Sequence, residues 1–237
     1  MTTEQVKTTD ALYSRFAVLF SYPDAEFAGK VREVQAFLDD TCAEAAGELK
    51  KFTDFASRAS LIELEELYTR SFDVQAITTL DLGYVLFGDD YKRGQLLVNL
   101  NAEHDKAGLD CNTELPDHLP NVLRLLDVMQ KSDLRDELVR RIVAPALRKI
   151  IGEFDPDKVE QKSVIYKKHH KTLIERSELH GILYRQPLRA LYTVMARDFD
   201  VRAEEVTAAP QQSRFLNSIG TEMKLESSKG NCHGPTG

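Results

Sequence analysis

The sequence predicts an all-α fold, a single-domain bundle of roughly eight to ten helices. Apolar side chains recur at the spacing of one helix face along most of the chain. The sequence contains neither alternating stretches of strand length nor the glycine patterns of Rossmann and P-loop folds. With 237 residues, 42% of them hydrophobic, the chain can bury a substantial core.

The first half of the chain has the pattern of successive amphipathic helices. Ser60 and Glu63 form a capping box, which predicts that a helix begins at Leu61. The run Gly88-Asp89-Asp90 indicates a turn. The apolar sets, in chain order, are Leu12, Phe16, Leu19 and Phe20; Val31, Val34, Phe37 and Leu38; Leu49, Phe52 and Phe55; Leu64, Leu67, Tyr68 and Phe72; Ile77, Leu80, Tyr84 and Phe87; and Leu96, Leu97 and Leu100.

Helical spacing resumes after a proline-rich corner at residues 114–120. Ser132 is a candidate cap for a further helix, and Pro145 inside that helix is expected to kink it. The apolar sets here are Leu119, Val122, Leu123, Leu126 and Met129; Leu134, Leu138, Ile142, Leu147 and Ile150; and Leu188, Leu191, Val194 and Met195.

Composition predicts a helical domain over residues 1–205 and a polar tail over residues 206–237. The tail has too little apolar surface to offset the entropy of ordering and is expected to be disordered. Within the domain, residues 153–185 form a basic excursion that is expected to be mobile or partly helical. Its lysines are Lys158, Lys162, Lys167, Lys168 and Lys171.

The net charge of −7 argues against nucleic acid or an anionic membrane as the main partner and favours a basic peptide or protein. The sequence offers no stretch of 18 apolar residues and no secretory signal, so neither a membrane span nor export is expected. The three cysteines, Cys42, Cys111 and Cys232, are odd in number and widely spaced. A reducing, cytoplasmic location without a disulfide framework is therefore predicted.

The corner at residues 114–120 (ELPDHLP) is the most informative local feature. Pro116 and Pro120 fix φ at about −65° and remove two backbone donors, which stiffens the segment. Asp117 is a candidate N-cap of the following helix, with Pro120 in the first turn. We therefore expect a rigid corner that holds Asp117 and His118 outward, side by side.

A second local feature is the pair Tyr68 and Phe72, four residues apart on one helical face. Such a stripe usually belongs to a core. Asp73 follows at the end of the helix, where a negative charge opposes the helix dipole. This unusual position leaves a pairing or ligand role open for Asp73.

Two catalytic interpretations compete with binding. Asp117 and His118 could form an acid–base pair, although a cap beside a satisfied histidine has the same pattern. The lysine-rich stretch could bind a nucleotide cofactor, although a solvated charge run is favoured because no glycine loop or helix cap accompanies the lysines. The sequence shows no metal-ligand spacing and no nucleophile elbow. The alternatives to a binding protein are thus a nucleotide- or cofactor-binding enzyme and a structural subunit of a mature complex.

Four segments together resemble the NarJ family, the nitrate reductase delta-subunit type of molybdenum cofactor assembly chaperone within the wider TorD/DmsD group. They are residues 19–24 (LFSYPD), 68–73 (YTRSFD), 87–95 (FGDDYKRGQ) and 114–120 (ELPDHLP). Their order and spacing agree with the family over roughly residues 10–150. Beyond residue 151, the basic excursion and the Cys232-His233 tail depart from it.

The resemblance implies an all-helical chaperone of the TorD/NarJ type that is not an enzyme and carries no cofactor or metal. Its expected partner is the N-terminal segment of a molybdenum-containing catalytic subunit, held for cofactor insertion in nitrate assimilation. Asp117 and His118 match the family's proline–aspartate–histidine motif, which is implicated in peptide binding. With this motif we group the flanking Glu114 and Pro116 and the groove positions Tyr22, Tyr68, Phe72 and Asp73 as the predicted peptide-binding residues.

Overall fold

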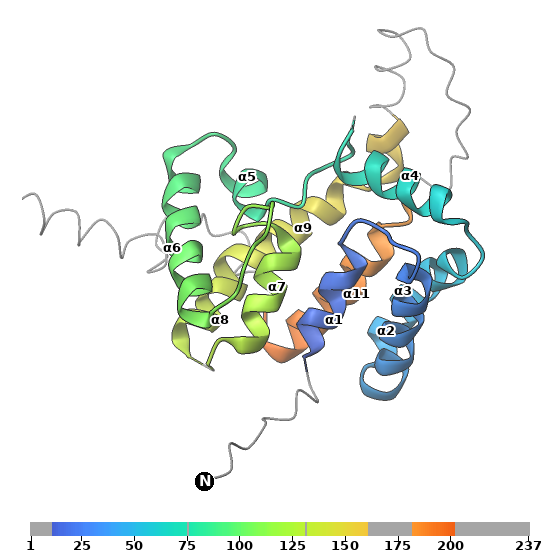
Figure 1. Cartoon of the computed structure of the whole chain (residues 1–237), viewed down its shortest axis with the longest axis horizontal. Helices are drawn as coiled ribbons and strands as arrows, with labels where there is room; N and C mark the ends of the chain where they lie inside the picture. Colours follow the sequence, from blue (N-terminus) through green and yellow to red (C-terminus); the bar gives the residue numbers. More distant parts are fainter. Residues whose placement is uncertain (1–10, 75, 131, 161–181, 202–237) are drawn as a thin grey trace, which may run out of the picture.

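The computed structural model describes residues 11–74, 76–130, 132–160 and 182–201, and within these ranges it is an assembly of helices (Figure 1). The one β-type pairing of the described residues is an isolated bridge between Asp81 and His118. The predicted all-α class is confirmed. The elements are α1 (Leu12–Leu19), α2 (Phe27–Thr41), α3 (Ala43–Ala56), α4 (Leu61–Phe72), α5 (Leu82–Phe87), α6 (Tyr91–Ala107), α7 (Leu119–Val128), α8 (Asp133–Leu138), the π-helix η1 (Val139–Val143), α9 (Ala144–Glu153) and α11 (Arg185–Asp198).

Two helix starts follow the predicted caps. The Ser60 hydroxyl accepts the backbone N–H of Glu63, and the Glu63 carboxylate accepts the N–H of Ser60 at 2.8 Å, so the capping box of α4 is complete. Ser132 likewise accepts the N–H of Arg135 at the start of α8. Both caps satisfy N–H groups that a first helical turn leaves without partners.

Near Pro145, where the sequence predicts a kink, the structure shows a change in helix type. Residues Val139–Val143 form a π-helix, and α9 begins at Ala144 with Pro145 in its first turn. A proline there removes an N–H that a helix start would leave unpaired anyway. The wider π-helical turn lies directly before Pro145 and its pyrrolidine ring.

The set Ile77, Leu80, Tyr84 and Phe87 does not lie on one helix. The chain is irregular up to Asp81, and only Leu82–Phe87 is helical. The irregular part folds back on the end of α4, where the N–H of Thr78 donates to the carbonyl of Ser71. This return places α5 against α9.

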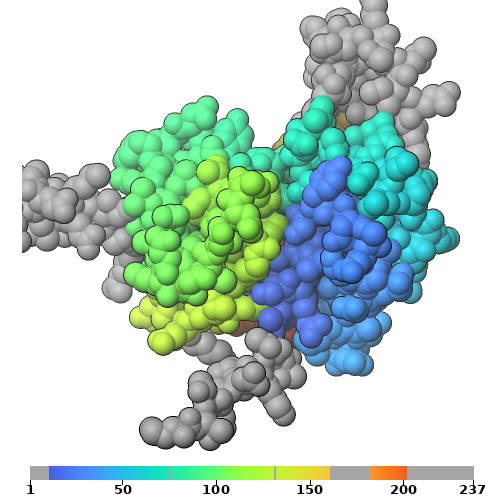
Figure 2. All heavy atoms as spheres, viewed as in Figure 1, coloured from blue at the N-terminus to red at the C-terminus, as the bar shows by residue number. Residues whose placement is uncertain are grey.

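The last helix, α11, packs along α3 and α9 and also contacts α1, so the C-terminal part of the described chain lies among N-terminal helices (Figure 1). Its predicted inner face, Leu188, Leu191, Val194 and Met195, is fully buried. One cluster of buried side chains runs through α1–α9 and α11. In Figure 2, blue α1 lies against the yellow-green α7, and these two helices are in contact.

Two earlier expectations fall largely on residues that the structure does not describe. Residues 161–181 of the basic excursion and all of the tail at 206–237 lie outside the described ranges. Among the residues that are described, no helix is both long and apolar enough to cross a membrane.

Candidate functional site

The proline corner is fixed to the segment before α5 by backbone hydrogen bonds. The N–H of Leu82 donates to the carbonyl of Asp117 at 3.0 Å, and the N–H of Leu119 donates to the carbonyl of Leu80 at 2.9 Å. The predicted rigid corner therefore exists, and its rigidity comes from this pairing as well as from its prolines. A buried side chain, Asn121, also holds the loop by donating to the carbonyl of Leu115 at 2.9 Å.

Asp117 is buried, which contradicts the expectation that it is held outward. Its side chain is 0% exposed. The residue at the N-cap of α7 is His118, which makes no side-chain cap bond, so the predicted cap at Asp117 is also wrong. Pro120 does lie in the first turn, as predicted.

The Asp117 carboxylate caps a different helix. Its Oδ2 accepts the backbone N–H of Gly83 at 3.0 Å, in the first turn of α5. The Nε of Arg93 lies 3.6 Å from the same oxygen. Backbone pairing of the two segments turns the carboxylate toward α5, where an N–H would otherwise be unpaired.

Gly83 is required by this arrangement. A Cβ on residue 83 would lie 2.6 Å from Oδ2 of Asp117 and 3.2 Å from Cγ of Arg93. Nothing in the local sequence indicates such a contact, because its two sides are 34 residues apart.

His118 pairs with Asp81 across the bridge. Its Nδ1 lies 3.2 Å from Oδ1 of Asp81, while Nη2 of Arg93 lies 3.4 Å from the other oxygen. The Arg93 guanidinium also lies over the Tyr84 ring, 5.2 Å from its centroid. Asp81, Arg93, Asp117 and His118 thus form a polar network, hereafter the corner network, that joins the corner to α5 and α6.

Burial raises the pKa of Asp117, and the negative charge of Asp81 raises it further, against a lowering by Arg93. The hydrogen bond from His118 lowers the pKa of Asp81 from its ordinary value of 3.8. The geometry pairs His118 with Asp81 rather than with Asp117. An acid–base pair of Asp117 and His118 is therefore not what the fold builds.

The lowered pKa of Asp81 predicts a pH dependence of stability. Its stabilising contribution is present above pH 3.8 and is lost as the pH falls through the folded-state pKa. We expect Asp81→Asn to be less stable than wild type at neutral pH, and this difference in stability should shrink as the pH falls below 3.8. Urea unfolding at a series of pH values measures the difference in free energy of unfolding between variant and wild type. Asp40→Asn, at an exposed position of α2, is the control. A stability difference between wild type and Asp81→Asn that stays the same at low pH would contradict the contribution assigned to the Asp81 charge.

A ladder of aromatic rings leads from the surface into the core. Tyr22 is 56% exposed and meets Tyr68 edge-on at 5.4 Å between ring centroids. Tyr68 meets Phe72 at 5.4 Å, and Phe72 meets the fully buried Tyr184 at 4.7 Å. Such edge-to-face contacts hold the rings in defined positions.

The hydroxyl of Tyr68 donates to the carbonyl of Phe20 at 3.3 Å, and the charges of three carboxylates act on it. Burial raises the pKa of Tyr68, and the charges of Glu114, Asp73 and Asp81 raise it further. These acids come from the corner, the end of α4 and the segment before α5. The fold therefore gathers Tyr22, Tyr68, Phe72, Asp73, Glu114 and His118 around one surface, hereafter the aromatic–acidic surface. Pro116 is half-buried in the turn that follows Glu114. Asp117 and Tyr68 are both buried, so the surface presents neither of these two predicted residues, and Tyr68 packs behind the exposed Tyr22 ring.

A groove of about 920 Å³ adjoins this surface and shares two residues with it, Phe72 and Asp73. The sequence analysis did not foresee the groove, because it is built from segments far apart in the chain. Its other lining residues are Ala76, Ile77, Thr78, Thr79, Tyr84, Val85, Arg148, Lys149, Gly152, Glu153 and Lys158.

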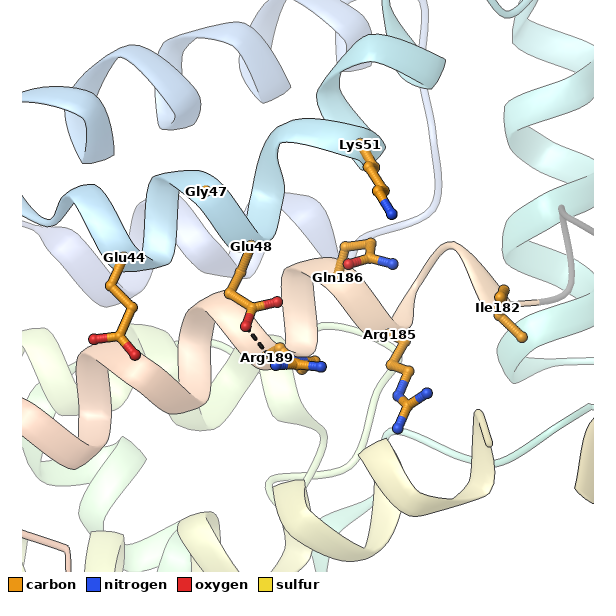
Figure 3. A pocket seen from close by; sticks show the side chains of 8 residues that line it. All are labelled: Glu44, Gly47, Glu48, Lys51, Ile182, Arg185, Gln186 and Arg189. Carbon is orange, nitrogen blue, oxygen red and sulfur yellow. Dashed lines mark hydrogen bonds and ion pairs between the residues drawn. The ribbon is translucent and has the colours of Figure 1, made fainter. Parts of the chain in front are cut away.

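A smaller pocket of about 430 Å³ lies between α3 and α11 (Figure 3). Glu48 and Arg189 form an ion pair of 2.5 Å across it, and Lys51 points from α3 toward α11. Its lining is mostly charged, with Ile182 as the one large apolar side chain. It lacks the apolar walls that bind a ligand by burial. In the part of the chain that the structure describes, no three His, Cys, Asp or Glu side chains group as a metal site.

Curated relatives share sequence with about half of this chain. NarW of Escherichia coli (strain K12), a probable nitrate reductase molybdenum cofactor assembly chaperone, is 32% identical over 140 residues, which cover 57% of this chain and 56% of that protein. NarJ of the same strain, a nitrate reductase molybdenum cofactor assembly chaperone, is 31% identical over 133 residues, or 54% of this chain and 56% of that protein. A probable NarJ of Bacillus subtilis (strain 168) is 30% identical over 122 residues, which cover 50% of this chain and 66% of that protein.

No protein-family model matches the chain. The chain spans a little over half the length of the first relatives that it matches. Those relatives are named as chaperones rather than as enzymes, which agrees with the prediction of a protein without catalytic activity. Over about half of its length, this all-helical chain is therefore similar to nitrate reductase molybdenum cofactor assembly chaperones of the NarJ and NarW type.

Proposed function

We propose that this protein is an assembly chaperone for a molybdenum enzyme of the nitrate reductase type. It binds the N-terminal segment of the catalytic subunit and keeps that subunit ready for cofactor insertion. The binding site is the aromatic–acidic surface.

The observation that carries this proposal is an exposed aromatic ring, Tyr22, in the same region as two exposed carboxylates, those of Asp73 and Glu114. Tyr22 offers an apolar anchor backed by Tyr68. Glu114 and Asp73 are exposed beside it. An amphipathic helix could pack its apolar face on the rings while its Lys or Arg side chains meet the acids.

The corner network supports this surface from below. Asp117 caps α5 and Arg93 packs on Tyr84, so these buried groups fix the position of side chains that a client would touch. Asp117 is thus a positioning residue in this proposal. His118, with a side chain only 13% exposed, contributes mainly by holding Asp81.

Calorimetric titration with a synthetic peptide of the first twenty or so residues of a nitrate reductase catalytic subunit from the same organism tests the proposal. We expect Tyr22→Ala to weaken binding about tenfold or more, because an aromatic anchor is lost. Glu114→Gln should weaken it about threefold or more, because an exposed charge contact is lost.

Two matched variants control for nonspecific effects. Tyr91→Ala removes a tyrosine that is 71% exposed on α6, and Asp40→Asn removes an exposed carboxylate on α2, both outside the surface. Each should bind the peptide as wild type does. Equal losses in the control and site variants, or a peptide that does not bind at all, would refute the assignment of this surface.

A further inference from the structure

The C-terminal tail carries a stripe of apolar residues at helical spacing. Its members, at positions i, i+1, i+4 and i+8, are Phe215, Leu216, Ile219 and Met223. On a helix these four side chains would share one face about 100° wide. Residues 213–225 also contain two basic side chains, Arg214 and Lys224, against one acid, Glu222. The sequence of this tail segment is thus that of a short amphipathic helix with a small excess of positive charge.

Such a stripe needs a surface to pack on. An isolated helix shorter than about 12–15 residues is marginal in water, and Gly220 lowers the helix propensity of the tail segment further. Four apolar side chains are too few to build a core of their own. Because the tail lies outside the described residues, the surface that would complete it is to be found among the elements that the structure does describe.

The aromatic–acidic surface has the complementary chemistry. Its exposed ring, Tyr22, is held from behind by Tyr68, and aromatic and thioether side chains such as those of the stripe pack well on a ring. Its exposed carboxylates, Asp73 and Glu114, suit the two bases of the tail segment. The segment therefore has the same apolar and basic character that the proposed function assigns to the client.

The tail is long enough to reach this surface. Tyr184, directly before α11, packs on Phe72 of the aromatic ladder, and the tail leaves the fold at the other end of α11, a helix of 14 residues or about 21 Å. Twelve residues, 202–213, precede Arg214. A flexible chain of that length spans about 20 Å on average and at most about 40 Å. Because the linker matches the distance, it holds the segment at an effective concentration on the order of 1 mM.

We propose that residues 213–225 of the tail bind the aromatic–acidic surface of their own chain when no client occupies it. The inference rests on the proposed function, which defines this surface as the client site. The tail then covers Tyr22 between clients, and a client binds by displacing it. A tail segment with a Kd of about 0.1 mM would lower the observed affinity of a client about tenfold at this effective concentration. Peptides that bind weakly are thereby rejected.

Photo-crosslinking of the full chain tests the contact without a client. Benzoyl-phenylalanine in place of Ile219 should attach, within the same molecule, to residue 22 or to residues 68–74 or 114–118. The matched control carries the probe in place of Thr221, on the opposite side of the segment, and should attach there much less. Attachment of the first probe elsewhere on the chain, or to a second molecule, would overturn the inference.

Calorimetric titration with the client peptide tests the competition. The full chain with Phe215→Ser and Ile219→Ser should bind the peptide about threefold or more tightly than wild type, because the competing tail is weakened. The control, with Asn217→Ser and Thr221→Ser on the opposite side of the segment, should bind as wild type does. Tyr22→Ala should cost more affinity in the Phe215→Ser, Ile219→Ser chain than in wild type, where it also weakens the tail.

The two proposals fail in different ways. If Tyr22→Ala weakens the client peptide but the Phe215→Ser, Ile219→Ser chain binds it with wild-type affinity, the tail does not compete. The further inference is then wrong, and the proposed function stands. If the probe at position 219 attaches to the surface but no client peptide binds there, the proposed function is wrong, and the contact of the tail stands.

Discussion

Replacement of Asp117 by alanine is expected to lower the free energy of unfolding by about 3 kcal/mol. The carboxylate is fully buried and accepts the N–H of Gly83. Its removal leaves that N–H in the interior without a partner, which costs about 1–3 kcal/mol. It also leaves a small void and takes away the charge beside Arg93.

Asp117→Asn removes the negative charge of the side chain and keeps an oxygen that can accept a hydrogen bond. Asparagine keeps an oxygen that can accept the N–H of Gly83, so its loss should be about 1 kcal/mol. Thermal and urea unfolding measure the loss of stability in both variants. For a chain of this size, each kcal/mol lost lowers Tm by about 2–4 °C. Equal losses in the two variants would show that the charge next to Arg93, rather than the capping of α5, is what stabilises the corner.

Peptide affinity provides the second measurement on these variants. At a temperature where Asp117→Asn is fully folded, its affinity for the client peptide should stay within about threefold of wild type, since Asp117 supports the site from beneath. A loss of tenfold or more in a folded Asp117→Asn protein would mean that this carboxylate reaches the client after all.

The helices were predictable because their signals are local. Apolar spacing and the caps at Ser60 and Ser132 depend only on residues within a few positions of one another. The rigidity of the corner was predictable from Pro116 and Pro120 in the same way. Each of these features is fixed by the chain itself before any distant segment packs against it.

The direction of the Asp117 side chain was not predictable, because a segment more than thirty residues away decides it. As a local pattern, an aspartate before a proline-containing first turn is a cap for that turn. The pairing of Leu80 and Leu82 with the corner rotates this aspartate toward α5 instead. The groove was missed for the same reason, since Phe72, Tyr84 and Lys149 belong to three helices that only the fold brings together.

The contact between Gly83 and Asp117 gives the second large effect. Gly83→Ala is expected to lower the free energy of unfolding by about 3 kcal/mol, or about 6–12 °C in Tm. The new Cβ would lie 2.6 Å from Oδ2 of Asp117, so the buried carboxylate must move and its bond to residue 83 must break. The backbone itself is not strained, because residue 83 lies in the first turn of α5.

A glycine elsewhere provides the matched control. Gly94 lies inside α6, and a Cβ there would meet no atom within 4 Å. Gly94→Ala should therefore stabilise the protein by about 0.5–1 kcal/mol, since alanine loses less backbone entropy in a helix. The same Gly→Ala replacement is thus expected to destabilise the protein at one position and to stabilise it at another, eleven residues away.

A double-mutant cycle identifies the cause of the Gly83 effect. If the clash with the carboxylate is responsible, Gly83→Ala should cost less than about 1 kcal/mol once Asp117 is already alanine. Urea unfolding of the wild type, both single variants and the double variant gives the coupling energy directly. Strictly additive losses would show that the methyl group is resisted by Leu96 or Arg93, at 3.1 and 3.2 Å, and not by the cap of α5.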